Sequence, residues 1–560
     1  MKKHSRMQVT PKDQRFDSID YISQLPDHVI HHILSHLPCN KDVARTSILS
    51  KKWRDIWASY IILDFDERKF HKQDWKHRFS LELLSIKFKK KKEMGMKAKN
   101  ELFRNFVDDT LERRIEQNGC IQKFGLHLTS YCKEQANHVN RWISLASKSK
   151  VQELDLHIPS NRNLYYDLPQ LVFASDSIIS LRIHGCRLGT CNDIKFSNLQ
   201  KLSFGKLNIN ENIIQNLMLS CPLINDFRLI YCIGVKNLVL LSDRLDRVDI
   251  HFCHGMEKIE IQSSSLQTFW YHANISRHCE VNLASCKYLK NLTFVDAKMN
   301  DATFQNHLSN FPVLGRLALS KCNALQFITI KSHHLKALAL RECAKLRETD
   351  IDTPNLLSFK YSGQTEWIPF SWMNPSGMKE AKLYFQCSST LHKSVSSIWY
   401  NGLTSFLKRF DHSKGMKLVV CSGENVIIHE DMKEVLIPLD CSLKLEIIVS
   451  SISLEDILDN LLRRWRPVTL SIVPSTSSDL PKLCQVQMKM ENREEEPSCC
   501  KYNSSNNKCW RHFLRDVKIE NLADFRMKSS WIDWLKISPS VVNQMKFFRL
   551  EWESLQGSIS

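Results

Sequence analysis

The sequence predicts an α/β protein in which a small N-terminal helical unit precedes a long repeat solenoid with a parallel sheet on its concave side. Two observations carry this prediction. Apolar residues recur at helical spacing between residues 17 and 57, and pairs of apolar residues recur every 21 to 27 residues between residues 154 and 361. At 560 residues the chain is too long for one compact core, so two or three units are expected.

The helical unit is predicted to contain two or three short helices. The first begins around Leu25-Pro26-Asp27, because proline has no amide hydrogen to lose at the first helical position and Asp27 favours the positive end of the helix dipole. Its apolar stripe consists of Val29, Ile30, Ile33, Leu34 and Leu37, and Pro38 ends it. A second helix after Asn40 carries Val43, Ala44 and Ile48, and Ser50 caps a third with Trp53, Ile56 and Trp57 on one face. Units of about 40 residues rarely bury enough surface to be stable alone, so the segment is interpreted as a docking device.

The segment LPDHVIHHILSHLP followed by KDVARTSILSKKWRDIW closely resembles the plant F-box over residues 19–63. The resemblance implies binding to a Skp-type adaptor, which links the chain to a cullin-RING ubiquitin ligase. It places the adaptor contact on Leu25, Pro26, Val29, Ile33, Leu37, Pro38, Leu49 and Trp53. His28 and Cys39 depart from the family pattern but lie off the apolar stripe. Some of these apolar residues must also pack against each other, and the sequence does not divide them between core and contact.

The middle of the chain carries a repeat. Pairs of apolar residues separated by one residue occur at Leu154/Leu156, Leu181/Ile183 and eight further places up to Phe359/Tyr361. Another apolar residue stands three positions before each pair, and Cys or Asn often stands three positions after it. This is the leucine-rich-repeat pattern, in which each coil buries its apolar face only against its neighbours. Most of the 19 cysteines are therefore interpreted as turn or core residues. Segments such as IEIQSSSL and ITIKSHHL are expected to form strands on the outer side of the coils.

The predicted organisation has seven segments: a basic flexible tail (1–18), the F-box (19–63), a helical and basic linker (64–120), the solenoid (121–365), an irregular continuation (366–472), a polar mobile insert (473–508) and a C-terminal segment (509–560). The last segment loosely resembles the FBD ends of the same plant family.

Composition limits the classes of function. The formal net charge of +18 is compatible with a nucleic-acid-binding protein, but much of the excess is local, in a lysine run between residues 87 and 99. The odd number of cysteines and the lack of an apolar leader in the first twenty residues fit a reducing compartment, so the nucleus or cytoplasm is expected. Since no stretch approaches 18 uncharged apolar residues, a membrane span is not expected.

Motifs for catalysis and phosphate binding are absent, so the chain is expected not to be an enzyme and to need no cofactor. Cys499, Cys500, Cys509 and His512 lie close enough for zinc but lack the C-x-x-C spacing, so no metal is expected. Recognition is instead expected on the outward strand positions Arg182, Arg228, Asp249, Trp270, His272, Arg341 and Lys360.

The sequence thus favours a substrate receptor of an SCF-type ubiquitin ligase, which would bind a protein substrate on the repeat. The alternatives are a nucleic-acid-binding protein and an F-box scaffold that does not lead to ubiquitin transfer.

Overall fold

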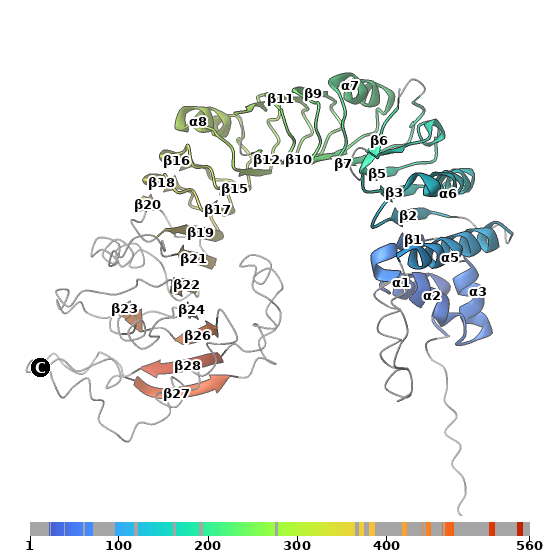
Figure 1. The fold of residues 1–560 in the computed structure, drawn as a ribbon. Helices are drawn as coiled ribbons and strands as arrows, with labels where there is room; N and C mark the ends of the chain where they lie inside the picture. The colour runs from blue at the N-terminus through green and yellow to red at the C-terminus, as the bar shows by residue number, and fades with distance from the viewer. Residues whose placement is uncertain are drawn as a thin grey trace, which may run out of the picture. The chain divides into compact units, whose positions relative to one another are not determined.

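The computed structural model consists of two compact units, Met1–Asn208 and Ile209–Ser560 (Figure 1). The structure describes residues 22, 24–37, 40–59, 62–70, 96–116, 121–160, 164–189, 194–274, 278–364, 369–373, 380–386, 417–422, 439–440, 444–449, 462, 465–466, 468–474, 514–520 and 546–552. The predicted tail (1–18) and polar insert (473–508, beyond Pro474) lie outside these residues.

Three short helices open the first unit: α1 (Asp27–Ser35), α2 (Asn40–Thr46) and α3 (Lys51–Ser59). Pro26 is the residue before α1, and its carbonyl oxygen accepts hydrogen bonds from the Val29 and Ile30 amides. The Ser50 hydroxyl accepts from the Trp53 amide at 3.2 Å, as an N-cap does. α2 is shorter than expected, because it ends at Thr46 and leaves Ile48 in the turn that follows.

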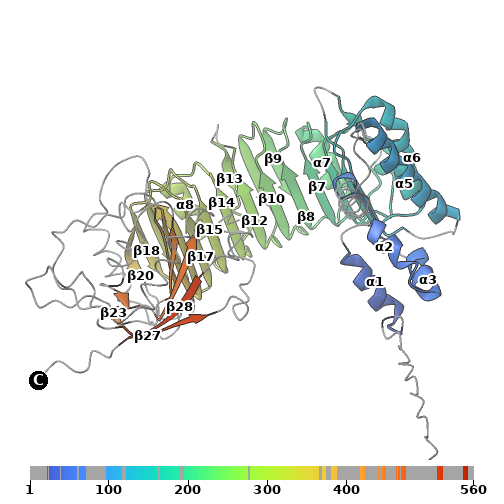
Figure 2. The ribbon, with the colours of Figure 1, turned by 60° about the horizontal axis from the view of Figure 1, so that its bottom comes forward.

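A parallel sheet fills the rest of the first unit. Its order is β1-β2-β3-β5-β7 (Ile62–Asp66, Lys123–His127, Glu153–His157, Ser180–His184, Lys201–Gly205), with a two-stranded pair β4 (Tyr166–Asp167) and β6 (Cys186–Arg187). The sheet therefore begins with a strand that precedes the predicted solenoid. Helices α5 (Met96–Glu116) and α6 (Ala136–Lys148) lie against each other (Figure 2), joined by the Trp142 indole N–H, which donates to Asp108 at 2.7 Å. Short 3-10 turns occupy Lys133–Gln135 and Gln170–Val172.

The second unit is built from a longer row of parallel strands, one per coil. The row comprises β8 (Asp226–Ile230), β10 (Arg247–His251), β12 (Thr268–His272), β14 (Asn291–Val295), β15 (Arg316–Ser320), β17 (Ala337–Arg341), β19 (Ser358–Gln364), β21 (Glu380–Gln386), β22 (Lys417–Ser422), β24 (Lys444–Val449) and β26 (Thr469–Pro474). Antiparallel strands β28 (Lys546–Trp552) and β27 (Leu514–Glu520) follow β26. The strand pattern thus continues well past Tyr361.

The return side of the coils carries shorter elements. Two three-stranded parallel sheets consist of β9 (Asn237–Leu241), β11 (Lys258–Gln262) and β13 (Glu280–Asn282), and of β16 (Phe327–Lys331), β18 (Glu348–Asp352) and β20 (Phe370–Met373). Helices α7 (Glu211–Ser220) and α8 (Asp301–Ser309) and the pair β23 (Leu439–Asp440) and β25 (Trp465–Arg466) complete the described elements. The expected strands at IEIQ and ITIK are β11 and β16.

The core lies between these rows, where the repeat pattern placed it. The apolar pairs of all ten predicted coils are at most 6% exposed, and the apolar residues three positions earlier are at most 1% exposed. The cysteines after the strands donate to the carbonyl two residues earlier, as Cys322 does to Ser320 at 3.5 Å. Within the described residues, no helix has the length and apolar character needed to cross a membrane.

Candidate functional site

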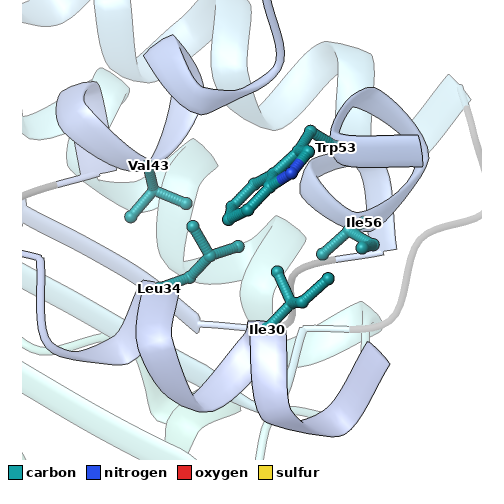
Figure 3. Packing of buried hydrophobic residues seen from close by; sticks show 5 residues of the cluster. All are labelled: Ile30, Leu34, Val43, Trp53 and Ile56. Atoms are coloured by element: carbon teal, nitrogen blue, oxygen red, sulfur yellow. The ribbon is translucent and has the colours of Figure 1, made fainter. Parts of the chain in front are cut away.

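The three N-terminal helices close around a small core of their own. Ile30 and Leu34 from α1, Val43 from α2, and Trp53 and Ile56 from α3 point toward one another (Figure 3) and are 0% to 4% exposed. Burial of side chains of this size contributes roughly 1.5–3 kcal/mol each. These five residues therefore hold the three helices together, and the apolar residues that remain on the surface are not needed for this packing.

Several large apolar side chains remain outside this core. Ile48 and Leu49, in the turn between α2 and α3, are 82% and 64% exposed, and Ile33 on α1 is 38% exposed. Backbone hydrogen bonds from the two turn amides to Arg45 and Thr46 at 3.2 and 3.0 Å hold the turn in place. An apolar pair presented on a fixed turn is suited to contact with a partner.

The predicted adaptor residues divide into three groups. Pro26, Ile33 and Leu49 are exposed, and Val29 is partly exposed. Leu25 and Leu37 are partly buried and pack against the core. Trp53 is 4% exposed and belongs to the core, which leaves little of its surface for an adaptor. Pro38 lies outside the described residues. Sequence reasoning missed Ile48 as a surface residue, although its spacing of five from Val43 places it off a helical stripe.

Lys52 on α3 ties the start of α1 to this unit. Its ammonium group donates to the Leu25 carbonyl at 2.9 Å and lies 3.6 Å from the Asp27 carboxylate. Nearby, Arg45 pairs with Asp42 at 3.0 Å. These exposed contacts orient the helices more than they stabilise them, because exposed ion pairs contribute about 0–1 kcal/mol.

A second candidate site lies on the outward face of strands β8, β10 and β12. Arg228, Asp249 and Trp270 occupy the middle positions of these strands and face one another directly in the strand register. The Trp270 side chain is 39% exposed, whereas Asp249 is 3% exposed. The exposed indole thus stands beside a nearly buried carboxylate.

Ion pairs neutralise the charges on this face. Arg228 donates to both Asp226 oxygens at 2.7 and 2.5 Å, and Arg247 donates to Asp249 at 2.9 Å. The hydrogen bonds that Arg228 donates to Asp226 raise the pKa of Arg228. The planar, two-pronged pair with Asp226 keeps the Arg228 side chain in a fixed position.

Aromatic rings cover the end of the same strands. Tyr231 and Phe252 follow β8 and β10 with positive φ angles of 54° and 52°, and their rings stack with centroids 4.8 Å apart. The Phe252 ring also contacts His272, whose Nε2 atom lies 3.2 Å from Asp296. Burial lowers the pKa of His272, so its imidazole is mainly neutral at neutral pH. With Trp270 these rings form what we call the aromatic face: Tyr231, His251, Phe252, Trp270 and His272.

The other predicted recognition residues lie elsewhere. Arg341 and Lys360 belong to β17 and β19, and strands β14 and β15 stand between them and β12. Arg182 belongs to the first unit, on β5, where it donates to Asp155 at 2.9 Å. Sequence reasoning missed Tyr231 and Phe252. Their signal is positional, because each directly follows an L-x-L strand.

No metal centre is present among the described residues, where no three His, Cys, Asp or Glu side chains are grouped as ligands. His32 and His36, which share a face of α1, contact each other with ring nitrogens 3.3 Å apart. The Cys499, Cys500, Cys509 and His512 group lies outside the described residues.

Comparison with known proteins places both parts of the chain. An F-box family model matches residues 22–64, and the leucine-rich-repeat model At1g61320/AtMIF1 matches residues 116–279 and 273–401. The fold and these matches define an F-box protein with a leucine-rich-repeat region. The chain belongs to the plant F-box/leucine-rich-repeat family.

Relatives in Arabidopsis thaliana carry both kinds of name. The chain is 37% identical to F-box/LRR-repeat protein At3g59200 over 32% of its own length and 28% of that protein. It is 28% identical to FBD-associated F-box protein At5g22730 over 42% of its own length and 45% of that protein. F-box/LRR-repeat protein 25 is 28% identical over 46% of this chain and 90% of that protein. The chain thus spans less than half of the length of the first two relatives.

Proposed function

We propose that this chain is the substrate-receptor subunit of an SCF-type cullin-RING ubiquitin ligase, working in the nucleus or cytoplasm. The F-box would bind a Skp-type adaptor, and through it the cullin and RING subunits. The repeat region would bind a protein substrate. The chain would catalyse no bond change itself, and its contribution would be to raise the effective concentration of a substrate lysine near the charged ubiquitin.

The observation that carries the proposal is the surplus of apolar surface on the F-box. Its five-residue core is closed, yet Ile48 and Leu49 remain 82% and 64% exposed beside it. Burial against an adaptor would recover roughly 1.5–3 kcal/mol for each side chain. The proposed adaptor contact therefore consists of Pro26, Val29, Ile33, Ile48 and Leu49, with Leu25 and Leu37 at its margin. Trp53 is assigned to the core.

The proposed substrate contact is the aromatic face. An exposed tryptophan among other aromatic side chains has the composition that carries most binding energy at protein interfaces. Arg228 and Arg247, on the strands beside the aromatic face, are already paired with Asp226 and Asp249, and this supports a protein partner more than the phosphates of a nucleic acid. The C-terminal residues 509–560, which include β27 and β28, are proposed to be the FBD-like segment.

Affinity purification from plant cells with cullin activity and the proteasome blocked tests the proposal. The wild-type chain is expected to retain the adaptor, cullin and RING subunits together. The Leu49→Asp variant is expected to lose all three while keeping proteins bound to the repeat. Retention of the adaptor by a folded Leu49→Asp variant, or its absence from the wild-type complex, would contradict the proposal. An adaptor complex that never supports ubiquitin transfer would favour the scaffold alternative.

A further inference from the structure

Two cysteines in consecutive coils of the second unit face each other. Cys322 and Cys343 stand two residues beyond the ends of β15 and β17, whose last residues, Ser320 and Arg341, are paired in the parallel register. Each thiol donates to the carbonyl two residues earlier, Cys322 to Ser320 and Cys343 to Arg341, both at 3.5 Å, and the two side chains interact electrostatically. Both are free cysteines, Cys322 fully buried and Cys343 partly exposed.

The backbone holds this thiol pair from both sides. Before it, the Lys321 amide donates to the Arg341 carbonyl at 2.8 Å, and the Lys321 ammonium lies 3.7 Å from Glu342. After it, the Ala344 amide donates to the Asn323 side chain at 2.8 Å. Adjacent strands lie about 4.8 Å apart, which falls within the range of Cα separations, about 4.4–6.8 Å, that a disulfide spans.

We propose that Cys322 and Cys343 form an oxidisable dithiol, a modification site that hydrogen peroxide converts to an inter-coil disulfide. The pair needs only side-chain rotation, because the backbone spacing is already set. The inference is independent of the proposed ligase function.

The electrostatics indicate which sulfur reacts first. Interaction with the Cys322 side chain lowers the pKa of Cys343, and the same interaction raises the pKa of Cys322. Because the thiolate is the nucleophile and Cys343 is the more exposed of the two, Cys343 is the attacking residue.

The reaction balances with peroxide as the only oxidant. The Cys343 thiolate attacks one peroxide oxygen, the O–O bond breaks, and a sulfenic acid and water result after proton uptake. The Cys322 sulfur then attacks the sulfenic sulfur, the S–O bond breaks, and a second water leaves with the Cys322 proton. The two thiols together lose two hydrogens, and peroxide is reduced to two waters.

A second pair in the same unit provides an internal comparison. Cys232 and Cys253 occupy the same positions after β8 and β10, and the Tyr231 amide donates to the His251 carbonyl at 2.8 Å beside them. Both thiols are buried, at 1% and 7% exposure, and the hydrogen bond with Cys232 raises the pKa of Cys253. This pair has the same strand register, but neither thiol is exposed to solvent, so it should react more slowly with peroxide.

To test the proposal, the full chain is first fully reduced and then treated with hydrogen peroxide, and samples are taken over time. Remaining thiols are blocked with N-ethylmaleimide, and peptides are identified by mass spectrometry without reduction. A linked Cys322–Cys343 peptide, two hydrogens lighter than the sum of its parts, is expected to appear before any Cys232–Cys253 peptide. The exposed Cys132 reports the reaction of an unpaired thiol.

Variants separate the two roles. In Cys322→Ser, Cys343 is expected to accumulate as a sulfenic acid trapped by dimedone, whereas in Cys343→Ser, Cys322 is expected to stay reduced. If a variant fails to fold, the time course of the wild-type chain still tests the proposal. The proposal is overturned if Cys322 and Cys343 stay reduced while Cys132 is oxidised, if either is linked mainly to another cysteine, or if the Cys232–Cys253 pair oxidises first.

Discussion

The imidazole of His251 meets the indole of Trp270 edge-on, with ring centroids 4.7 Å apart and ring planes 74° apart. The two residues lie diagonally on neighbouring strands β10 and β12. Edge-to-face ring pairs of this kind contribute about 0.5–1.5 kcal/mol beyond the area they bury. The contact therefore fixes the indole in place while leaving 39% of Trp270 exposed.

A fixed, exposed indole is expected to anchor a partner. Trp270→Ala should reduce the recovery of repeat-bound proteins at least tenfold, since interface tryptophans often contribute 2 kcal/mol or more. Tyr288→Ala is the matched control, because Tyr288 is 62% exposed in the same unit but lies outside the aromatic face. Quantitative mass spectrometry of purified complexes compares the two. Equal losses from both variants would show that the aromatic face does not bind these proteins.

The assignment of Trp53 to the core predicts a stability effect. Trp53→Ala removes a side chain that is 4% exposed and leaves a cavity, so it should cost about 3–5 kcal/mol in the free energy of unfolding of the F-box. Leu49→Ala, at a position 64% exposed, should cost less than about 1 kcal/mol. Chemical denaturation measures both values. A small loss in the free energy of unfolding for Trp53→Ala would show that Trp53 is a surface residue and not part of the core.

Two glycines with the same backbone conformation should differ in tolerance. Gly185 and Gly255 both have φ of +80°, a region that costs other residues about 1–2 kcal/mol. A Cβ atom on Gly185 would overlap the Ile158 carbonyl oxygen, whereas one on Gly255 meets nothing within 4 Å. Gly185→Ala should therefore be the more destabilising change by at least about 2 kcal/mol. Similar unfolding midpoints for the two variants would show that the Ile158 contact is not limiting.

Stability of the first unit should depend on pH through a histidine stack. The His157 and His184 rings stack with centroids 4.0 Å apart, and burial lowers the pKa of His157 and that of His184, the latter to about 4. An unfolded chain binds the same proton near pH 6.5. The contribution of the neutral histidine stack to stability is therefore complete above pH 6.5. It is lost as the pH falls toward 4, because only the unfolded state gains the proton in this range.

The variant His184→Gln removes part of that dependence. Thermal unfolding of the wild type and the variant between pH 7.5 and 4.5 should give curves that converge as the pH falls. Curves that stay parallel over this range would show that His184 does not contribute to the pH dependence.

The sequence was sufficient to predict the repeat core but not the surface residues of its turns. The L-x-L periodicity predicts burial at every pair from Leu154/Leu156 to Phe359/Tyr361, because inward positions alternate strictly along a strand. The periodicity carries no information on the residues with positive φ that follow the strands. It therefore does not predict that Tyr231 and Phe252 lie in the aromatic face with Trp270. Nor did it reveal that Arg182 belongs to a different unit from the other recognition residues.

The F-box shows the same division. Helical spacing and the Ser50 cap predicted α1 and α3, since local hydrogen bonding and a single apolar stripe determine both. The apolar stripe alone could not show that Trp53 is buried and Leu49 exposed, because the burial of each residue depends on how the three helices pack together. Strand β1 was missed, because it stands before the first recognisable repeat.

The exposed apolar turn of the F-box, Ile48 and Leu49, is proposed to bind a Skp-type adaptor. Titration calorimetry of the purified adaptor against the wild-type chain, Ile48→Asp and Leu219→Asp tests it directly. Ile48 and Leu219 are both 82% exposed, but Leu219 lies on α7 in the second unit. We expect Ile48→Asp to weaken adaptor binding at least tenfold, whereas Leu219→Asp should bind like the wild type. Wild-type affinity in the Ile48→Asp variant would contradict the proposed binding.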